Sequence, residues 1–284
     1  MRFSCTDFSF PLLSHEAALD LVAAMGFEAV DLVVASGVGH VRPEAVADHP
    51  EGWAERLRER IGARGLAVSD VLLIQGSHHG DIPYNHPDPD RRERALELFE
   101  ATLKMASGVG AGGITVLPGP RFEGEPAAAS AERSAEALAE LLVHAAETGL
   151  TLSAEPHLGA WAETPAGALE LVERCPGLKL TVDYGHFVYQ GIAAEEVDAL
   201  LPHARHLHVR GGCPGRLQTT SRENTIDFAR IVERLLTAGY GGDLATEFVW
   251  FQGEGPYSRC DEVDCVAESV RAREALAAAA RDRG

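Results

Sequence analysis

Residues 178–186 read Leu-Lys-Leu-Thr-Val-Asp-Tyr-Gly-His, a short apolar run that ends in a carboxylate and an imidazole. Helical patterns rich in alanine, leucine and glutamate lie on both sides of it, at 165–174 and 194–201. A β-branched run between two such patterns is typical of a strand in a parallel sheet, because parallel strands are joined by crossover helices. This stretch therefore predicts one βα unit whose polar residues lie at the carboxyl end of the strand.

The same alternation runs along the rest of the chain. Strand-like runs are expected at 2–5, 28–34, 66–74, 113–117, 150–155, 178–183, 204–209 and 243–248. Helical patterns are expected at 15–25, 52–64, 91–107, 130–148, 165–174, 194–201, 226–238 and 261–281. Eight consecutive units without a composition shift or a linker predict an α/β fold, a single-domain (β/α)8 TIM barrel over residues 1–284. An open doubly wound sheet is disfavoured, because the first strand is not followed by a glycine-rich phosphate turn.

Glycines lie at several of the expected junctions between a helix and the next strand. They are Gly26, Gly65, Gly149 and Gly239. A glycine at this place commonly adopts the left-handed conformation that ends a helix, so the four positions predict helix caps.

The composition limits the classes of partner. The chain is 45% hydrophobic and 24% charged, as in an ordinary soluble globular protein. Its formal net charge is −18 and it has no basic run, so nucleic acid is not expected as a partner. No apolar run approaches the roughly 20 residues that span a bilayer, and no apolar targeting segment opens the chain. We therefore expect a cytoplasmic protein without a membrane partner.

The five cysteines form an odd set without a CxxC pair. Neither a disulfide framework nor a zinc knuckle is indicated, and reduced, mostly structural thiols are expected.

The last four expected strands each end in a carboxylate or an imidazole. Strand five ends at Glu155, strand six at Asp183, strand seven in the pair His206 and His208, and strand eight at Glu247. In a barrel these side chains would converge at one mouth, where carboxylates repel one another unless a cation is present. Ordinary polar residues are the alternative, and four consecutive hits would arise by chance on the order of once in several hundred chains. Oxygen ligands with one nitrogen suit Mn²⁺ or Mg²⁺.

This series of Glu, Asp-x-x-His, His-x-Arg and Glu resembles the xylose isomerase-like barrels. That group includes ketose 3-epimerases, hydroxypyruvate isomerase, inosose dehydratase and, more distantly, endonuclease IV. The resemblance covers nearly the whole chain, including residues 26–32 at the entry into strand two and residues 238–242 on the approach to strand eight. Its motifs are specific for the fold and the metal and weak for the substrate.

The resemblance implies roles for individual residues. The ligands of one divalent ion would be Glu155, Asp183, His208 and Glu247, with Mn²⁺ expected first and Mg²⁺, Co²⁺ or Zn²⁺ as alternatives. His186 and Arg210 would contact substrate oxygens. His208 is preferred to His206 because it directly precedes Val209-Arg210. His206 shares its strand face and is expected one layer deeper, as a core histidine. His157 is either a substrate contact or a loop histidine.

Two segments depart from the family pattern. Gly211 follows Arg210 where many members have an acidic residue, and the loop beyond it contains Arg216 and Gln218. Arg216 either binds an anionic or polyhydroxylated part of the substrate or faces solvent. In the loop after strand three, His78 and His79 bind substrate, bind a further metal or face solvent.

The predicted function is that of a metal-dependent isomerase or epimerase of a small sugar, sugar acid or keto-polyol. In the epimerases that the chain resembles, two glutamates move a proton on opposite faces of one carbon, and Glu155 and Glu247 match them. A lyase acting on a keto-inositol or keto-glycoside begins with the same proton abstraction and is not separated by sequence.

Two further classes are less favoured. An endonuclease IV-like phosphodiesterase would need more ligands, and Asp227 is followed by Phe228 and Ala229 where Asp-x-His is expected. A non-enzymatic binding barrel would predict gaps in the ligand set. The expected partner is a small carbohydrate-like molecule, and assembly into a homo-oligomer stays open.

Overall fold

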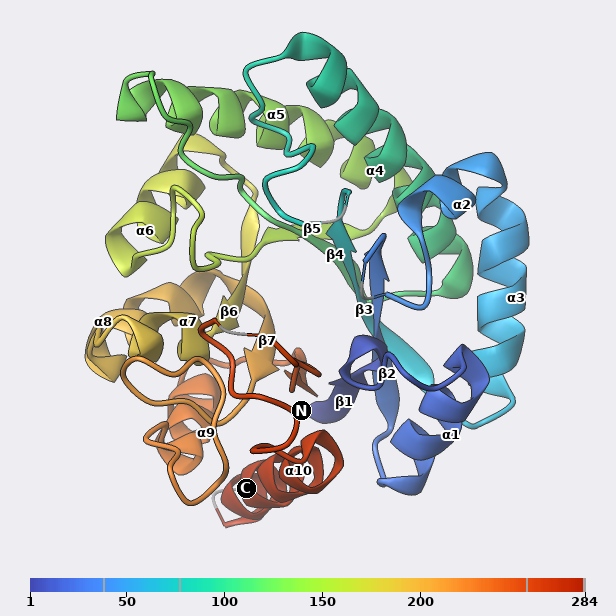
Figure 1. Cartoon of the computed structure of the whole chain (residues 1–284), viewed down its shortest axis with the longest axis vertical. Helices are drawn as coiled ribbons and strands as arrows, with labels where there is room; N and C mark the ends of the chain where they lie inside the picture. Colours follow the sequence, from blue (N-terminus) through green and yellow to red (C-terminus); the bar gives the residue numbers. More distant parts are fainter. Residues whose placement is uncertain (38, 77, 254, 283–284) are drawn as a thin grey trace.

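Eight parallel strands form a barrel in chain order, and the pairing of the first strand with the last closes it (Figure 1). The structure is a computed structural model that describes residues 1–37, 39–76, 78–253 and 255–282. The strands are β1 (Arg2–Thr6), β2 (Ala29–Ala35), β3 (Ala67–Ile74), β4 (Gly113–Val116), β5 (Thr151–Ala154), β6 (Lys179–Asp183), β7 (Ala204–Val209) and β8 (Asp243–Thr246). The predicted (β/α)8 barrel is therefore confirmed.

Helices form a ring around the barrel (Figure 1). They are α1 (His15–Ala24), α2 (Pro43–Asp48), α3 (Pro50–Gly62), α4 (Pro89–Val109), α5 (Ala127–Thr148), α6 (Pro165–Arg174), α7 (Tyr184–Tyr189), α8 (Ala194–Val197), α9 (Phe228–Thr237) and α10 (Cys265–Arg281). Two short 3-10 helices are η1 (Asp7–Ser9) and η2 (Asp198–His203). The four predicted glycine caps all adopt positive φ angles, between 69° and 81°.

The helix prediction was wrong in three places, the first of which is the short helix α2, where no helix was expected. Helix α7 was missed because it begins directly after β6, where Asp183 accepts a 2.7 Å hydrogen bond from the Gly185 N–H as its cap. The expected helix at 194–201 splits into α8 and η2, since Pro202 lies within the 3-10 segment and has no N–H to donate. The differences at α7 and at α8 and η2 lie between β6 and β7 in the chain, and α7 begins at the carboxyl end of β6.

The alternation of side chains along β2 separates two environments. Val30, Leu32 and Val34 belong to the large apolar cluster that also contains Leu57 of α3 and Phe99 of α4. Asp31 points the other way and meets His206 of β7 across the barrel, with Nε2 of His206 2.6 Å from Oδ2 of Asp31. The barrel interior below the mouth is therefore polar, whereas the shell under the helices is apolar.

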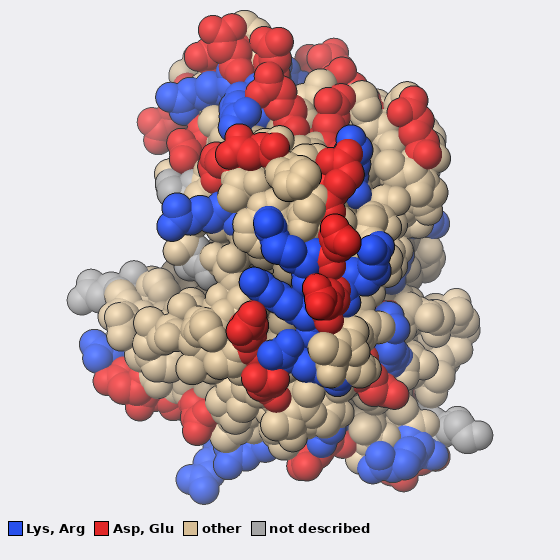
Figure 2. All heavy atoms as spheres, turned by 90° about the vertical axis from the view of Figure 1, so that its right-hand side faces the viewer, with Lys and Arg blue, Asp and Glu red and all other residues tan. Residues whose placement is uncertain are grey.

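On the face seen in Figure 2, Lys and Arg are interspersed with Asp and Glu. In the described part of the chain, no helix combines the length and apolar character needed to cross a membrane.

Candidate metal centre

The four expected ligands lie together at the carboxyl ends of the last four strands. Asp183 ends β6, His208 lies near the end of β7, and Glu155 and Glu247 directly follow β5 and β8. The N–H groups of Glu155 and Glu247 each donate a 3.0 Å hydrogen bond to the neighbouring strand, which extends the sheet pairing by one residue. All four side chains are buried, so they face one another and not bulk water.

One imidazole nitrogen lies close to a carboxylate oxygen of each glutamate. Nδ1 of His208 lies 2.9 Å from Oε1 of Glu155 and 3.3 Å from Oε2 of Glu247. Nε2 of His208 points away from them, 3.5 Å from Oδ2 of Asp31. A carboxylate behind a histidine commonly fixes the ring of a metal ligand, and Asp31 occupies that place.

Arg210 lies against two of the expected ligands. Its Nε donates a 2.8 Å hydrogen bond to Oδ2 of Asp183, and its Nη2 contacts the same oxygen and lies 2.5 Å from Oε2 of Glu247. Nη1 of Arg210 is buried and has no hydrogen-bond partner. The guanidinium thus neutralises the carboxylates on one side and leaves one donor unused.

His186 lies on the other side of the cluster. Its Nε2 is 3.8 Å from Oε1 of Glu155 and 3.7 Å from Oδ2 of Asp183. The Leu158 N–H donates to Nδ1 of His186 over 3.3 Å, which assigns the proton of a neutral ring to Nε2. This Nε2 is buried and unpartnered, so it forms a second unused donor aimed at the cluster.

The donor set fits a divalent cation. Ligand atoms of Glu155, His208 and Glu247 lie within 4.8 Å of one another, as do those of Glu155, Asp183 and His186. The two groups share Glu155, and all their members are buried. A buried set rich in carboxylate oxygens with imidazole nitrogen is chemistry that holds Mn²⁺ or Mg²⁺.

The pKa values of the two glutamates in the cluster are shifted in opposite directions. Burial raises the pKa of Glu155, even though the adjacent His208 acts in the opposite direction. Burial also opposes ionisation of Glu247, but Arg210 and His208 outweigh it and lower its pKa to about 2. Burial favours neutral His208, yet Glu247 and Glu155 raise its pKa well above the usual value. The two carboxylates therefore occupy unequal environments within one site.

His157 lies beside the cluster. Its ring centroid is 4.1 Å from that of His186, and burial lowers the pKa of His157 to about 4. His157 therefore lies next to the cluster, and its contact with substrate stays a prediction. His79 stands next in line, with its ring 5.4 Å from His157, and His78 follows at 6.4 Å from His79. Ser77 of the same loop lies outside the described residues.

Arg216 is not brought against the four ligands. Its guanidinium contacts Glu223 at 3.0 Å, Ser258 at 2.8 Å and Glu262 at 3.3 Å. Gln218 is also held by a backbone contact, with its amide donating to the Val249 carbonyl over 3.0 Å. These residues join the loop after β7 to the loop after β8.

Two residues near the site were missed in the sequence. Asp31 interrupts an otherwise apolar strand, and that interruption could have identified it as an interior carboxylate. Tyr257 places its ring 5.6 Å from Cζ of Arg210, and its irregular loop contains no periodic signal. His206, expected as a core histidine one layer deeper, does lie there against Asp31.

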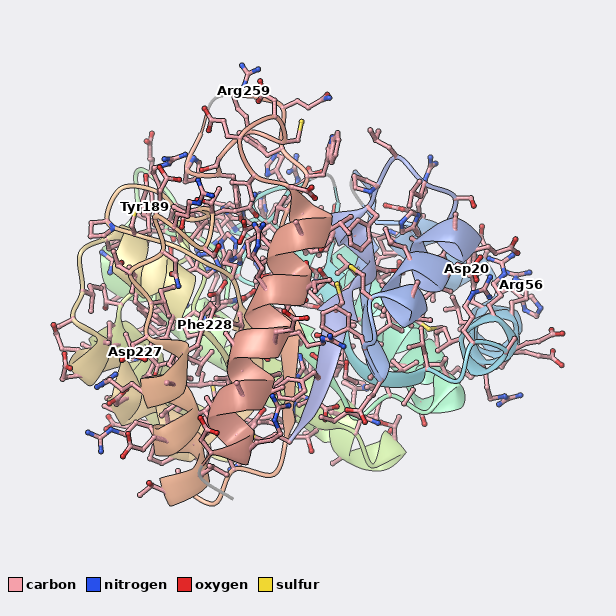
Figure 3. The ribbon with its side chains drawn as sticks, turned by 90° about the horizontal axis from the view of Figure 1, so that it is seen from below. Asp20, Arg56, Tyr189, Asp227, Phe228 and Arg259 are labelled. Carbon is pink, nitrogen blue, oxygen red and sulfur yellow. The ribbon has the colours of Figure 1, made fainter. Side chains whose placement is uncertain are left out.

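Asp227 has a structural role. Its side chain accepts a 3.0 Å hydrogen bond from the Arg230 N–H and caps α9, near whose start Figure 3 labels Asp227 and Phe228. A carboxylate used as a helix cap does not extend the cluster toward the larger ligand set of a phosphodiesterase.

Comparisons with known proteins identify a family and similar folds. A family described as xylose isomerase-like TIM barrel matches residues 19–272. No curated protein matches the sequence significantly. Similar solved structures include D-psicose 3-epimerase from Clostridium cellulolyticum H10 (16% identity, 99% of each chain covered, TM-score 0.75). They also include an L-ribulose 3-epimerase (20%, 99% of this chain and 96% of that chain, 0.75) and the E. coli 3-keto-D-glucoside 4-epimerase (18%, 98% of each, 0.70). At these identities the likeness establishes the fold.

Proposed function

The chain belongs to the xylose isomerase-like TIM barrel family, and on that premise we propose that it is a metal-dependent epimerase or isomerase. Its substrate would be a small sugar, sugar acid or keto-polyol. The observation that most supports this proposal is that carboxylate oxygens of Glu155 and Glu247 both lie close to Nδ1 of His208, inside a buried cluster.

The ion would be held by Glu155, Asp183, His208 and Glu247, and we propose Mn²⁺. When bound, such an ion stabilises negative charge on substrate oxygens.

The two glutamates supply the proton chemistry. One carboxylate removes the proton on the carbon next to the carbonyl. The C–H electron pair becomes the new C=C bond, and the π electrons of the carbonyl move to its oxygen, which gives the enediolate. The other carboxylate returns a proton to the opposite face of the same carbon. Positioned acid–base catalysis of this kind contributes about 10²–10⁴-fold.

His186 and Arg210 position the substrate. Nε2 of His186 and Nη1 of Arg210 are buried donors without partners, and unpaired buried donors are costly. Substrate oxygens would satisfy both.

Proton exchange tests the proposal. The Mn²⁺-loaded protein is incubated in D₂O with D-fructose, D-psicose, L-ribulose and a 3-keto-D-glucoside, and NMR follows the hydrogen alpha to each carbonyl. Deuterium at that carbon together with an epimer or isomer is expected for at least one compound. Loss of a leaving group would identify a lyase, and absence of both exchange and product across the panel would contradict the proposal. Glu147→Gln, on the exposed face of α5, serves as the control for loss of a carboxylate.

A further inference from the structure

A cavity of about 440 Å³ lies over the barrel mouth. Its walls come from loops at the ends of several strands and include Phe8, Ile74, Leu117 and Trp250. His157 and Tyr257 belong to the same walls and contact the metal cluster through His186 and Arg210. A molecule whose reacting carbon lies at the cluster would therefore extend directly into this cavity.

The cavity is poor in hydrogen-bonding side chains. Among the described side chains that line it there is no Asp, Glu, Lys, Arg, Asn, Gln, Ser or Thr. The polar members are three histidines, Trp250 and Tyr257. Nδ1 of His157 is already engaged with the Leu158 carbonyl at 2.7 Å. Hydroxyl groups of a free sugar placed here would lose water without gaining enough partners, and each such loss is unfavourable.

Aromatic rings supply much of the remaining wall. Phe8, Trp250, Phe251 and Tyr257 all line the cavity, and the rings of Phe251 and Tyr257 lie 5.6 Å apart at a tilt of 48°. Such rings favour tilted or offset contacts with a further aromatic ring. The loop with Tyr257 is held in place by the hydrogen bond from the Leu217 N–H to the Pro256 carbonyl, over 2.8 Å.

We propose that this cavity binds an aromatic group attached to the substrate, so that the preferred substrate is a sugar joined to an aromatic alcohol. The inference rests on the proposed function for the sugar end, which the cluster would hold through its unused donors. The cavity volume lies within the range of about 300–1,000 Å³ typical of small-molecule sites, which leaves room for a ring beyond the sugar.

Calorimetric titration of the Mn²⁺-loaded protein tests the inference without turnover. The probes are phenyl β-D-glucopyranoside and methyl β-D-glucopyranoside, which share one sugar and differ in the attached group. The phenyl compound is expected to bind about tenfold to a hundredfold more tightly, from the apolar area that its ring would bury. Equal affinity for the two probes would overturn the inference.

Substitutions in the cavity wall test which residues cause the preference for the phenyl probe. Trp250→Ala and Phe251→Ala are each expected to reduce the preference for the phenyl probe by at least about threefold. Val143→Ala, an exposed apolar residue on the outer helix α5, should leave it unchanged. Circular dichroism establishes folding, and if Trp250→Ala does not fold, Phe251→Ala decides. A preference that survives intact in every folded wall variant would place the ring elsewhere and overturn the assignment.

The outcomes separate this inference from the proposed function. Tight binding of the phenyl probe that depends on the wall, without proton exchange on any ketone, would leave the cavity assignment standing and remove the epimerase. Exchange on a free ketose without a preference between the two probes would do the reverse.

Discussion

Arg210 lies within hydrogen-bonding distance of both Asp183 and Glu247, with Nε 2.8 Å from Oδ2 of Asp183 and Nη2 2.5 Å from Oε2 of Glu247. The guanidinium is almost fully buried, so its positive charge offsets two carboxylates that a divalent cation would also bind. The chain's own cation and a metal ion would therefore act on the same pair of side chains, and this relationship can be tested.

Replacing Arg210 with methionine is expected to make folding depend on metal. Removing one partner from a buried ion pair typically costs about 3–5 kcal/mol, because the remaining charges are left uncompensated. Urea unfolding should show this loss with EDTA and a clear recovery with Mn²⁺. Arg259→Met removes an exposed pair with Asp261 on the loop that projects beyond the barrel in Figure 3, and it should change little. If Arg210→Met lowers the free energy of unfolding equally with and without Mn²⁺, then Arg210 and the metal ion do not act on the same carboxylates.

The purified protein is expected to bind about one divalent ion per chain after reconstitution with Mn²⁺, because one oxygen-rich cluster closes the mouth. Elemental analysis measures the content. Asp183→Ala should lose most of the metal, whereas Asp261→Ala, an exposed carboxylate, should retain it. Full metal content in Asp183→Ala would remove that residue from the ligand set.

Glu155→Gln and Glu247→Gln are each expected to lower kcat by about 10²–10⁴-fold, since each removes one half of the proton transfer. Both residues are also proposed ligands, so the metal content of each variant is measured beside its activity. A metal-loaded Glu247→Gln protein with nearly normal turnover would exclude the two-glutamate mechanism and favour a lyase or a hydride shift.

Arg216→Ala is expected to raise KM and leave kcat largely unchanged, because a contact made equally before and during the reaction affects binding alone. Arg216 also donates hydrogen bonds to Ser258 and Glu262, so a variant of Glu262 tests whether these contacts affect KM. If Arg216 acts by joining the two loops, Glu262→Ala should reproduce the increase in KM. An increase confined to Arg216→Ala indicates direct contact with substrate, and an unchanged kcat/KM in both variants would mean that neither role exists.

Alkylation should distinguish the cysteines. Burial raises the pKa of Cys5 and of Cys265 to about 12, and that of Cys175 to about 11, so few of these groups are thiolates at pH 8. Iodoacetamide is therefore expected to label the partly exposed Cys213 and Cys260 in the folded protein. Mass spectrometry after unfolding should find all five modified. Rapid labelling of Cys5 in the folded state would contradict its burial.

The sequence by itself determined the barrel and the four residues at its strand ends. Three features are local in the sequence: the apolar runs of strand length, the polar residues at the ends of β5 to β8, and the glycine caps at Gly26, Gly65, Gly149 and Gly239. Each is visible within a few neighbouring residues, because side chains alternate along a strand and a helix end needs a particular φ.

Only the tertiary structure decided which partners these residues meet. Asp31 and His206 are 175 positions apart, and their contact depends on the register and closure of the whole barrel. The bond of Arg216 to Ser258 and the apolar cavity over the mouth likewise combine loops from different strands. Local sequence patterns contain no information on how irregular loops pack against one another. The strand ends therefore predicted the chemistry of the cluster, while its surroundings followed from the fold.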